Sequence, residues 1–490
     1  MVLCRINPMA QATETASGGQ ERKAIIRATT LCAWLIAIAS AGLTLYVAYC
    51  MYTHFKMRVN DYGIYTNFIW NSAHGEPFRY LAEQSYLGVH LSFTLLLIAP
   101  LFWIWDHPFL LTLVQWLCAV AGAMLVRRIA RRHGFPPVLT AAFAMLFMAY
   151  PYMQSVLLCD FHGVCVYFVL LPWLYHCLAF RREMVWLPLL LILGLREDAA
   201  FVAVPMILYF AVAERWKGGY VYAGIALAYA ALACLALFPL LNGTTMRQIP
   251  KRGSHLHMAT VMESFSARSL VHRVEAVFWL FLPATLLFRR GWAPVVVFPS
   301  LGLLIVQLSP EARVQALNVH YPAAVFSCLV LGMIEAVRRH DVPGSPGRGS
   351  NGLLLAVFLI AVTVIAYAGM GRLPGGRSTN PRKMLLTVSQ HGLQALWVAQ
   401  HEIPKQGLLL TDTDLVGFCA NRADVLVRQR YGGPWETAHA VFLTLKEFAD
   451  AGAKAKALLD SGKYGVTYWD GTFMVLQRGA SPLRNREILK

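Results

Sequence analysis

The chain has 490 residues, of which 57% are hydrophobic and only 14% are charged. A soluble domain carries about 25% charged residues, so this composition excludes a soluble globular protein. The net charge of +17 comes as short basic pairs between apolar runs, which is the positive-inside pattern of a membrane protein and not a nucleic-acid-binding patch. We therefore expect a mostly α-helical polytopic membrane protein with no nucleic-acid partner.

The first apolar run extends from about Ala28 to Met51 and follows a polar segment that contains several basic residues. These basic residues predict that segment 1–27 is a cytoplasmic tail. The run is long enough to remain as a membrane span, and no cleavable signal peptide is evident before it. Segment 52–107 is then expected to be an outer loop on the opposite face of the membrane.

Later apolar runs predict about 11 spans in a transmembrane domain that covers residues 28–370. The run Leu91–Trp105 is too short for a comfortable crossing, so we interpret it as an interfacial or re-entrant helix. With that choice every basic pair falls on one side of the membrane. The predicted spans are about 28–51, 108–126, 135–152, 163–180, 184–195, 199–213, 219–241, 271–288, 294–308, 321–337 and 352–370.

The composition becomes more polar after residue 370, which predicts a linker over 371–380 and a small periplasmic α/β domain over 381–490. Apolar spacing predicts helices, and β-rich runs on either side of Asp470-Gly471 predict a hairpin. The expected helices are 382–401 and 443–459, and the expected strands are 407–410, 464–469 and 472–476.

The most informative stretch is Asn60–Asn71, which places a carboxylate, a glycine and several aromatic residues just after the first span. The Asp61 carboxylate could accept a proton from an incoming hydroxyl or amine, or hold a metal bound to a phosphate. Alternatively, Asp61 caps a helix that starts near Tyr62, because Asp is a favoured N-cap residue. Both interpretations stay open from the sequence.

The aromatic side chains of this outer loop also have two interpretations. Tyr62, Tyr65, Trp70 and Tyr80 could form an interfacial belt, since Tyr and Trp are enriched where the membrane meets water. They could equally bind substrate by stacking on sugar rings.

Asp160 and His162 flank one phenylalanine on a second predicted outer loop. An Asp-x-His pair could ligate a divalent metal such as Mg²⁺ or Mn²⁺, but further ligands would have to come from elsewhere, with His90 and Asp61 as candidates. The alternative is a hydrogen-bonded pair at a helix end. No cofactor is certain from these residues.

Arg196, Glu197 and Asp198 are three adjacent charges between apolar runs, and such charges must be paired or solvated. The guanidinium could bind a lipid phosphate with two hydrogen bonds. The rival interpretation is a structural ion cluster that joins helices.

A further predicted outer loop carries Lys251, Arg252, His255 and His257, a composition that suits a phosphate or diphosphate group. An ordinary solvated loop is the alternative. Nothing in the chain resembles a Walker loop, a dinucleotide fingerprint or a Gly-x-Ser-x-Gly elbow, so nucleotide-driven transport and serine hydrolysis are poorly supported.

Taken as an ordered set, these motifs resemble the bacterial membrane proteins of domain-of-unknown-function family 2079. The resemblance covers roughly Val59 to the C-terminus and includes His320-Tyr321 and the tail from Ile403-Pro404 to Asn421-Arg422. The motifs that carry it are Asp61 to Tyr65, Asn67 to Asn71, His74-Gly75, Gly88 to His90, Asp160 to His162 and Arg196 to Asp198.

That family is similar in architecture to the GT-C glycosyltransferases, which take sugars from polyprenyl-phosphate donors on the outer side of the membrane. The resemblance implies that Asp61 is the catalytic base or a metal-orienting acid and that Asp160 is a second catalytic acid. The chain departs from the pattern where His162 accompanies Asp160 and where Arg196 replaces the usual Lys.

The leading hypothesis is a multi-pass enzyme of the bacterial inner membrane that transfers a sugar from a polyprenyl-phosphate donor on the periplasmic face. The acceptor could be a lipid, a glycan or a protein. Asp61, Asp160 and His162 are the expected catalytic residues. The residues expected to bind substrate are Tyr62, Tyr65, Trp70, His90, Arg196, Glu197, Asp198, Lys251, Arg252 and His320. The alternatives are a transporter or flippase of a lipid-linked glycan and a non-catalytic membrane scaffold.

Overall fold

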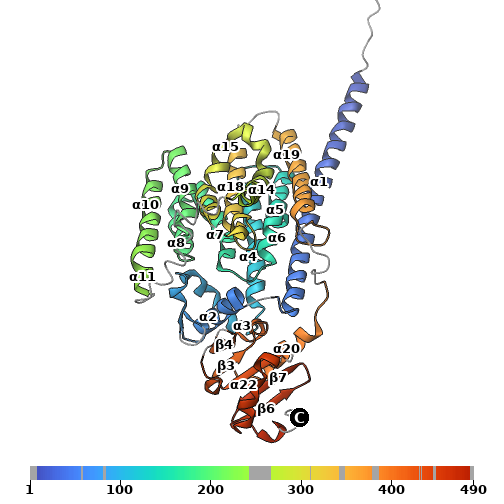
Figure 1. Ribbon diagram of the computed structural model, residues 1–490. Helices are drawn as coiled ribbons and strands as arrows, with labels where there is room; N and C mark the ends of the chain where they lie inside the picture. The colour runs from blue at the N-terminus through green and yellow to red at the C-terminus, as the bar shows by residue number, and fades with distance from the viewer. Residues whose placement is uncertain are drawn as a thin grey trace, which may run out of the picture.

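The fold is a bundle of helices that carries a small sheet-containing domain at one end (Figure 1). A computed structural model describes residues 8–56, 59–80, 84–241, 266–309, 311–340, 348–377, 386–429, 431, 433–444 and 448–485. The predicted basic loop with Lys251 and Arg252 lies outside the described residues.

The bundle is formed by long apolar helices whose buried side chains make one continuous core. Helix α1 (Pro8–Thr53) is 46 residues long and extends beyond the bundle (Figure 1). The other helices of the bundle are α4 (Leu110–Arg132), α5 (Pro137–Ala149), α6 (Pro151–Leu157), α7 (Tyr167–Phe180), α8 (Trp186–Leu193), α9 (Ala200–Ala213), α10 (Lys217–Leu232), α11 (Phe238–Leu241), α14 (Ala267–Phe281), α15 (Phe288–Val297), α16 (Ser300–Leu308), α17 (Ala312–Gln315), α18 (Pro322–His340) and α19 (Arg348–Met370).

The described helices do not confirm the predicted count of about 11 spans. Six of them are long and apolar enough to cross a membrane, or seven if the bent pair 291–297 and 300–308 is one span. Several predicted spans are shorter than a crossing requires, since α8 has 8 residues and α9 has 14. The chain is nevertheless a polytopic membrane protein by these helices.

The segment after α1 packs across one end of the bundle. It contains a short π-helix, η1 (Val59–Gly63), followed by α2 (Ile64–Ala73), and the antiparallel pair β1 (Arg79–Tyr80) and β2 (Gln84–Ser85). The apolar stretch 91–105 forms the short helices η3 (Phe93–Ile98) and α3 (Leu101–Ile104). These are too short to cross a bilayer, which agrees with the predicted interfacial or re-entrant helix.

The C-terminal domain is built on a five-stranded mixed sheet of order β4-β3-β5-β7-β6. Strands β3 (Leu408–Thr411), β4 (Asp424–Val427) and β5 (Ala440–Thr444) are parallel, whereas β6 (Tyr464–Trp469) and β7 (Phe473–Arg478) form the hairpin that the Asp470-Gly471 turn predicts. Helices α20 (Gln390–His401), α21 (Val416–Cys419) and α22 (Phe448–Asp460) complete the domain. Strands β4 and β5 were missing from the sequence prediction, and residues 443–444, which were predicted to begin a helix, lie at the end of β5.

Direct hydrogen bonds join the C-terminal domain to the segment around α2. The Asn67 amide donates to the backbone carbonyls of Ala420 and Arg422, at 3.2 and 2.6 Å. Asp106 accepts from the Asn421 amide at 2.9 Å and pairs with Lys405 at 3.1 Å. The domain is therefore packed onto the end of the bundle by buried polar contacts.

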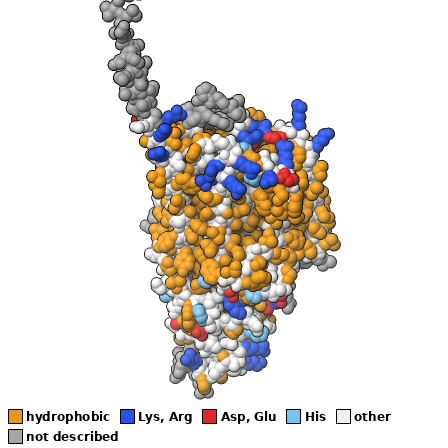
Figure 2. Space-filling view, turned by 180° about the vertical axis from the view of Figure 1, so that it is seen from behind, with side chains coloured by type: hydrophobic (Ala, Val, Ile, Leu, Met, Phe, Trp, Pro, Cys, Tyr) orange, Lys and Arg blue, Asp and Glu red, His pale blue; other side chains and the backbone are white. Residues whose placement is uncertain are grey.

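The surface of the bundle shows where a membrane would lie. Figure 2 shows hydrophobic side chains covering the sides of the bundle, with Lys and Arg gathered at the end opposite the C-terminal domain. At the cytoplasmic end expected from sequence, Glu335 is buried and pairs with Arg338 and Arg339 at 2.7 Å. One charged end and an apolar band are what a bilayer requires of its protein.

Candidate functional site

The first predicted catalytic residue, Asp61, lies in the π-helix η1 at the end of the bundle that carries the C-terminal domain. Its side chain is half-buried. Helix α2 begins at Ile64 with Gly63 as its N-cap, and a capping role for Asp61 stays a prediction. A π-helical turn is a rare element that is frequent at functional sites.

Gly63 explains why this turn can pack against the C-terminal domain. A Cβ atom at Gly63 would lie 3.1 Å from a methyl carbon of Val416 in α21. The missing side chain therefore brings the Asp61 turn and α21 into close contact.

Asp160 directly follows Cys159 in the chain, and the fold brings the distant Asp61 within electrostatic reach of the same thiol. Burial raises the pKa of the Cys159 thiol well above its usual value, and the charges of Asp160 and Asp61 raise it further. Asp160 also adds to the raised pKa of the buried Tyr62, which lies beside Asp61 in the chain. Both predicted catalytic carboxylates are thus within electrostatic reach of one sulfur atom.

His162 is 5% exposed and is held in place from several sides. Its ring stacks on that of His320, with 3.7 Å between centroids and 15° between planes. Its backbone N–H donates to Gln115 at 3.2 Å, and its Nε2 atom lies 3.5 Å from the Tyr65 hydroxyl.

The charge state of His162 follows from this environment. Burial lowers the pKa of His162 well below its usual value, and the nearby His320 and Arg196 lower it further. The imidazole is therefore neutral at pH 7. Its Nδ1 atom accepts from the Val164 N–H at 3.5 Å, so the ring proton is on Nε2, which donates to the Tyr65 hydroxyl.

Tyr65 connects His162 with the first carboxylate. Burial raises the pKa of Tyr65 to about 12; the Asp61 charge contributes in the same direction and the Arg196 charge opposes it. Tyr65 therefore lies within reach of both charges and stays protonated at neutral pH.

The three consecutive charges 196–198 are used in two separate ion pairs. The Arg196 guanidinium binds both carboxylate oxygens of Asp198, each at 3.0 Å. Glu197 instead pairs with His90 at 2.9 Å. Burial by itself would raise the pKa of Glu197, but His90 and Arg196 hold it well below its usual range. This geometry favours the structural ion cluster, and phosphate binding by Arg196 stays a prediction.

The aromatic residues of the α2 segment are buried and do not form an interfacial belt. Tyr62 is 0% exposed and its hydroxyl donates to the carbonyl of Pro108 at 2.5 Å. Trp70 is 7% exposed and its indole N–H donates to Asp106 at 3.0 Å. Sugar stacking by these side chains stays a prediction that their burial does not support.

The predicted metal candidates do not assemble into a recognisable site. No group of three or more His, Cys, Asp or Glu side chains within the described part of the chain is arranged to hold a metal ion. His90 is engaged by Glu197, and His162 has its ring against His320. The reaction proposed below therefore contains no step at a metal ion.

Arg372 and Gln115 are the residues that the sequence reasoning missed. Arg372 falls in the predicted linker 371–380, but its charge reaches Cys159 and lowers the pKa of that thiol, against the two aspartates. Its position directly after the last span was a usable signal, because an ionisable group at a membrane boundary has to find a partner. Gln115 lies inside an apolar run, and in the sequence its only signal is that it is a single amide within a predicted span.

Comparisons with known proteins identify a family and a similar fold. A family model described as "Predicted membrane protein (DUF2079)" matches residues 52–466. Among solved structures, ArnT from Cupriavidus metallidurans bound to undecaprenyl phosphate is similar, with a TM-score of 0.53 and 14% identity over 91% of this chain and 98% of that chain. The same protein in the apo state has a TM-score of 0.50 and 13% identity over 90% and 97% of the two chains. No curated protein matches the sequence.

Proposed function

This chain belongs to the DUF2079 family of predicted membrane proteins, and we propose that it is a glycosyltransferase that moves a sugar from a polyprenyl-phosphate donor to an acceptor. The convergence of Asp61 and Asp160 near Cys159 is the observation that supports this most directly. The ArnT-like GT-C fold, in a relative that was solved with undecaprenyl phosphate, supports the donor class.

The proposed reaction needs one base and one stabilised leaving group. The acceptor oxygen or nitrogen attacks the anomeric carbon of the sugar as the bond from that carbon to the phosphate oxygen breaks. Asp61 takes the acceptor proton, and the electron pair of the broken bond stays on the polyprenyl phosphate. A base positioned for this transfer contributes about 10²- to 10⁴-fold to the rate.

The other residues near Asp61 suit supporting roles. Asp160 would orient the acceptor, and the neutral His162 would donate a hydrogen bond from Nε2 to the Tyr65 hydroxyl. Holding donor and acceptor at one membrane surface supplies proximity and orientation. Whether Mg²⁺ or Mn²⁺ contributes to the reaction is tested by the chelator assay described below.

We place the enzyme in the bacterial inner membrane with its N-terminus in the cytoplasm and its C-terminal domain in the periplasm. The basic end of the bundle lies opposite that domain (Figure 2), and basic residues favour the cytoplasmic side. The C-terminal domain, packed against α2, would then bind the acceptor or cover the site.

The test is transfer of a radiolabelled sugar from a panel of polyprenyl-phosphate donors by the full chain in proteoliposomes. Asp61→Asn keeps the shape of the side chain but removes the base, so we expect transfer to fall by about 100- to 10,000-fold with the protein still folded. Asp460→Asn, an exposed position at the end of α22, is the matched control and should transfer normally.

Two outcomes would overturn the assignment. A fully active Asp61→Asn variant would remove Asp61 as the base. Labelled lipid that crosses the bilayer uncleaved, with no transfer from any donor, would favour the transporter. A parallel assay with chelator decides whether a metal takes part.

A further inference from the structure

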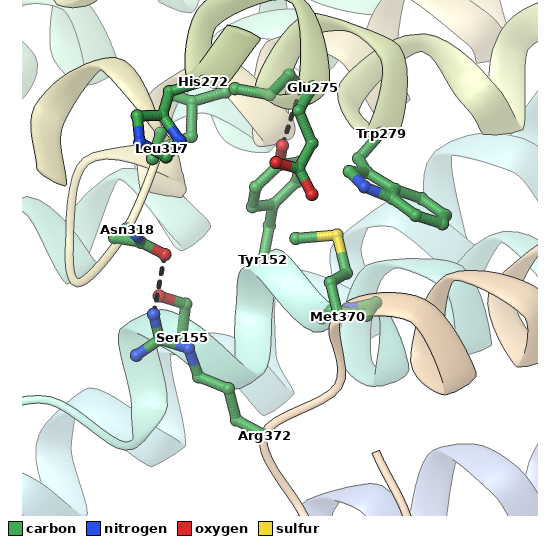
Figure 3. A pocket seen from close by; sticks show the side chains of 12 residues that line it. Tyr152, Ser155, His272, Glu275, Trp279, Leu317, Asn318, Met370 and Arg372 are labelled. Atoms are coloured by element: carbon green, nitrogen blue, oxygen red, sulfur yellow. Dashed lines mark hydrogen bonds between the residues drawn. The ribbon is translucent and has the colours of Figure 1, made fainter. Parts of the chain in front are cut away.

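A cavity of about 390 Å³ lies where α6, α14, the loop after α17 and the end of α19 meet. Figure 3 shows its polar side chains in two groups. Arg372, Asn318 and Ser155 lie on one side, and Glu275 points into the space beside Tyr152. His272, Trp279 and Met370 contribute the remaining labelled walls.

Arg372 differs from Arg196 and Arg338 in its partners. Its guanidinium donates to the Asn318 side-chain oxygen at 2.7 Å, and its backbone N–H donates to Gln154 at 3.0 Å. Among the described residues no carboxylate forms an ion pair with it, whereas Arg196 is bound by Asp198 and Arg338 by Glu335. Burial lowers the pKa of Arg372, which is the effect of a desolvated cation without a full counter-charge.

The residue that positions this guanidinium is itself held in an unusual backbone segment. Leu317 and Val319, on either side of Asn318, have φ values of 51° and 62°. A β-branched residue with positive φ is a conformational outlier, and such strain concentrates at functional sites. The Ser155 hydroxyl donates to the Val319 carbonyl at 3.1 Å and fixes the segment to α6.

The cavity is next to the predicted catalytic carboxylates. The charge of Arg372 acts on the Cys159 thiol together with those of Asp160 and Asp61. Cys159 and Asp160 directly follow α6, the helix that supplies Tyr152 and Ser155 to the cavity.

Helix α14 lines the cavity with one face and exposes apolar side chains on another. On α14 the residues Leu270, Val271, Val274 and Phe278 are all more than half exposed and lie on one helical face. Trp279 and Met370 continue the apolar lining at the cavity.

We propose that this cavity binds the phosphate group of a polyprenyl phosphate, with Arg372 as its cationic ligand and Asn318 as the residue that orients the guanidinium. This rests on the proposed function in that the bound phosphate is the donor's leaving group. The phosphate keeps the electron pair of the broken glycosidic bond, and Arg372 neutralises the added charge. Glu275 and Tyr152 lie on the opposite side, where they suit the hydroxyl groups of the sugar.

The test measures binding of undecaprenyl phosphate to the full chain in nanodiscs, with undecaprenol as the uncharged probe and inorganic phosphate as competitor. Arg372→Gln removes the cation, and Asn318→Asp keeps the shape but gives Arg372 a carboxylate partner. Because a hydrogen bond to a charged group contributes about 1.5–3 kcal/mol, we expect each variant to bind undecaprenyl phosphate roughly 10- to 100-fold more weakly. Arg377→Gln, an exposed arginine on the same segment, is the control and should bind normally.

The outcomes separate this proposal from the proposed function. Equal binding of undecaprenol and undecaprenyl phosphate, or unchanged binding by both variants, overturns the phosphate site even if transfer is observed. If both variants bind undecaprenyl phosphate more weakly but no sugar transfer is measurable, the phosphate site is supported and the glycosyltransferase assignment is rejected. Displacement by millimolar inorganic phosphate would identify a site for free phosphate instead of a lipid headgroup.

Discussion

At the scale of single residues, ion pairs distinguish charged side chains that stabilise the fold from charged side chains that can bind a ligand. Arg196 and Glu197 have their charges balanced by Asp198 and His90, so their first role is to hold the turn between α8 and α9. A buried pair of this kind is strongly destabilised when one partner is removed. Within the described part of the chain, the Arg372 guanidinium is bound by the Asn318 amide oxygen and by no carboxylate, so its charge stays available.

The buried His162 predicts a pH dependence of stability. Its lowered pKa in the folded protein means that the unfolded chain binds more protons once the pH falls below about 6.5. The stability that the neutral ring contributes is therefore complete above that pH and is lost as the pH falls toward the lowered value.

We expect the melting temperature of wild type to decrease between pH 6.5 and 5, and the decrease to be smaller in His162→Gln. Thermal unfolding in detergent at several pH values measures it. The exposed His401→Gln serves as the control and should keep the wild-type slope. A His162→Gln slope equal to that of wild type would contradict this explanation.

At the scale of elements, close backbone contacts decide how the C-terminal domain meets the bundle. Helix α20 begins with Ser389, whose hydroxyl accepts from the Gly392 N–H at 3.2 Å and whose own N–H donates to Thr53 at the end of α1. A Cβ atom at Gly392 would overlap the backbone carbonyl of Thr53. The two helices can therefore meet only with glycine at this position.

The variant Gly392→Ala tests this contact. Overpacking against a backbone atom costs about 1–3 kcal/mol, so we expect a lower melting temperature and earlier cleavage between the domain and the bundle in limited proteolysis. Gly42→Ala is the matched control, because Gly42 lies within α1 with nothing within 4 Å of its Cβ position. That change should be neutral or slightly stabilising, since Ala is favoured over Gly in helices. Equal behaviour of the two variants would show that the contact is unimportant.

At the scale of the whole molecule, the bundle and the C-terminal domain share buried polar contacts that fix α2. The Asn67 amide is bound by carbonyls of the C-terminal domain, and Arg422, also buried, donates to the carbonyls of Pro404 and Ala399. Since α2 directly follows the Asp61 turn, this interface positions the proposed base.

Asn67→Asp should loosen the interface without changing its volume. A carboxylate cannot donate to the carbonyls of Ala420 and Arg422, which would leave both without this partner at a cost of about 1–3 kcal/mol. We expect reduced thermal stability and reduced sugar transfer, the latter through a displaced Asp61. The exposed Gln390→Glu makes the same amide-to-acid change and should leave both unchanged. If the Asn67→Asp variant is less stable but transfers sugar at the normal rate, the interface does not control the position of Asp61.

The sequence by itself determined the class of the protein and several of its elements. Apolar runs of membrane length and basic pairs define a polytopic helical protein, because a bilayer requires both. The Asp470-Gly471 turn defined the β6–β7 hairpin, since a two-residue turn is a local interaction. The short stretch 91–105 was recognised from length alone.

Only the tertiary structure decided which of the predicted charges are available for chemistry. The bidentate pairing of Arg196 with Asp198, and that of Glu197 with His90, depends on side-chain geometry that spacing does not encode. The number of spans also depends on tertiary packing, because short helices such as α8, which buries one face against its neighbours, need not cross. In the sequence, Arg372 belongs to a predicted linker. The fold places it beside Asn318 and within electrostatic reach of the Cys159 thiol, which makes it a candidate phosphate ligand.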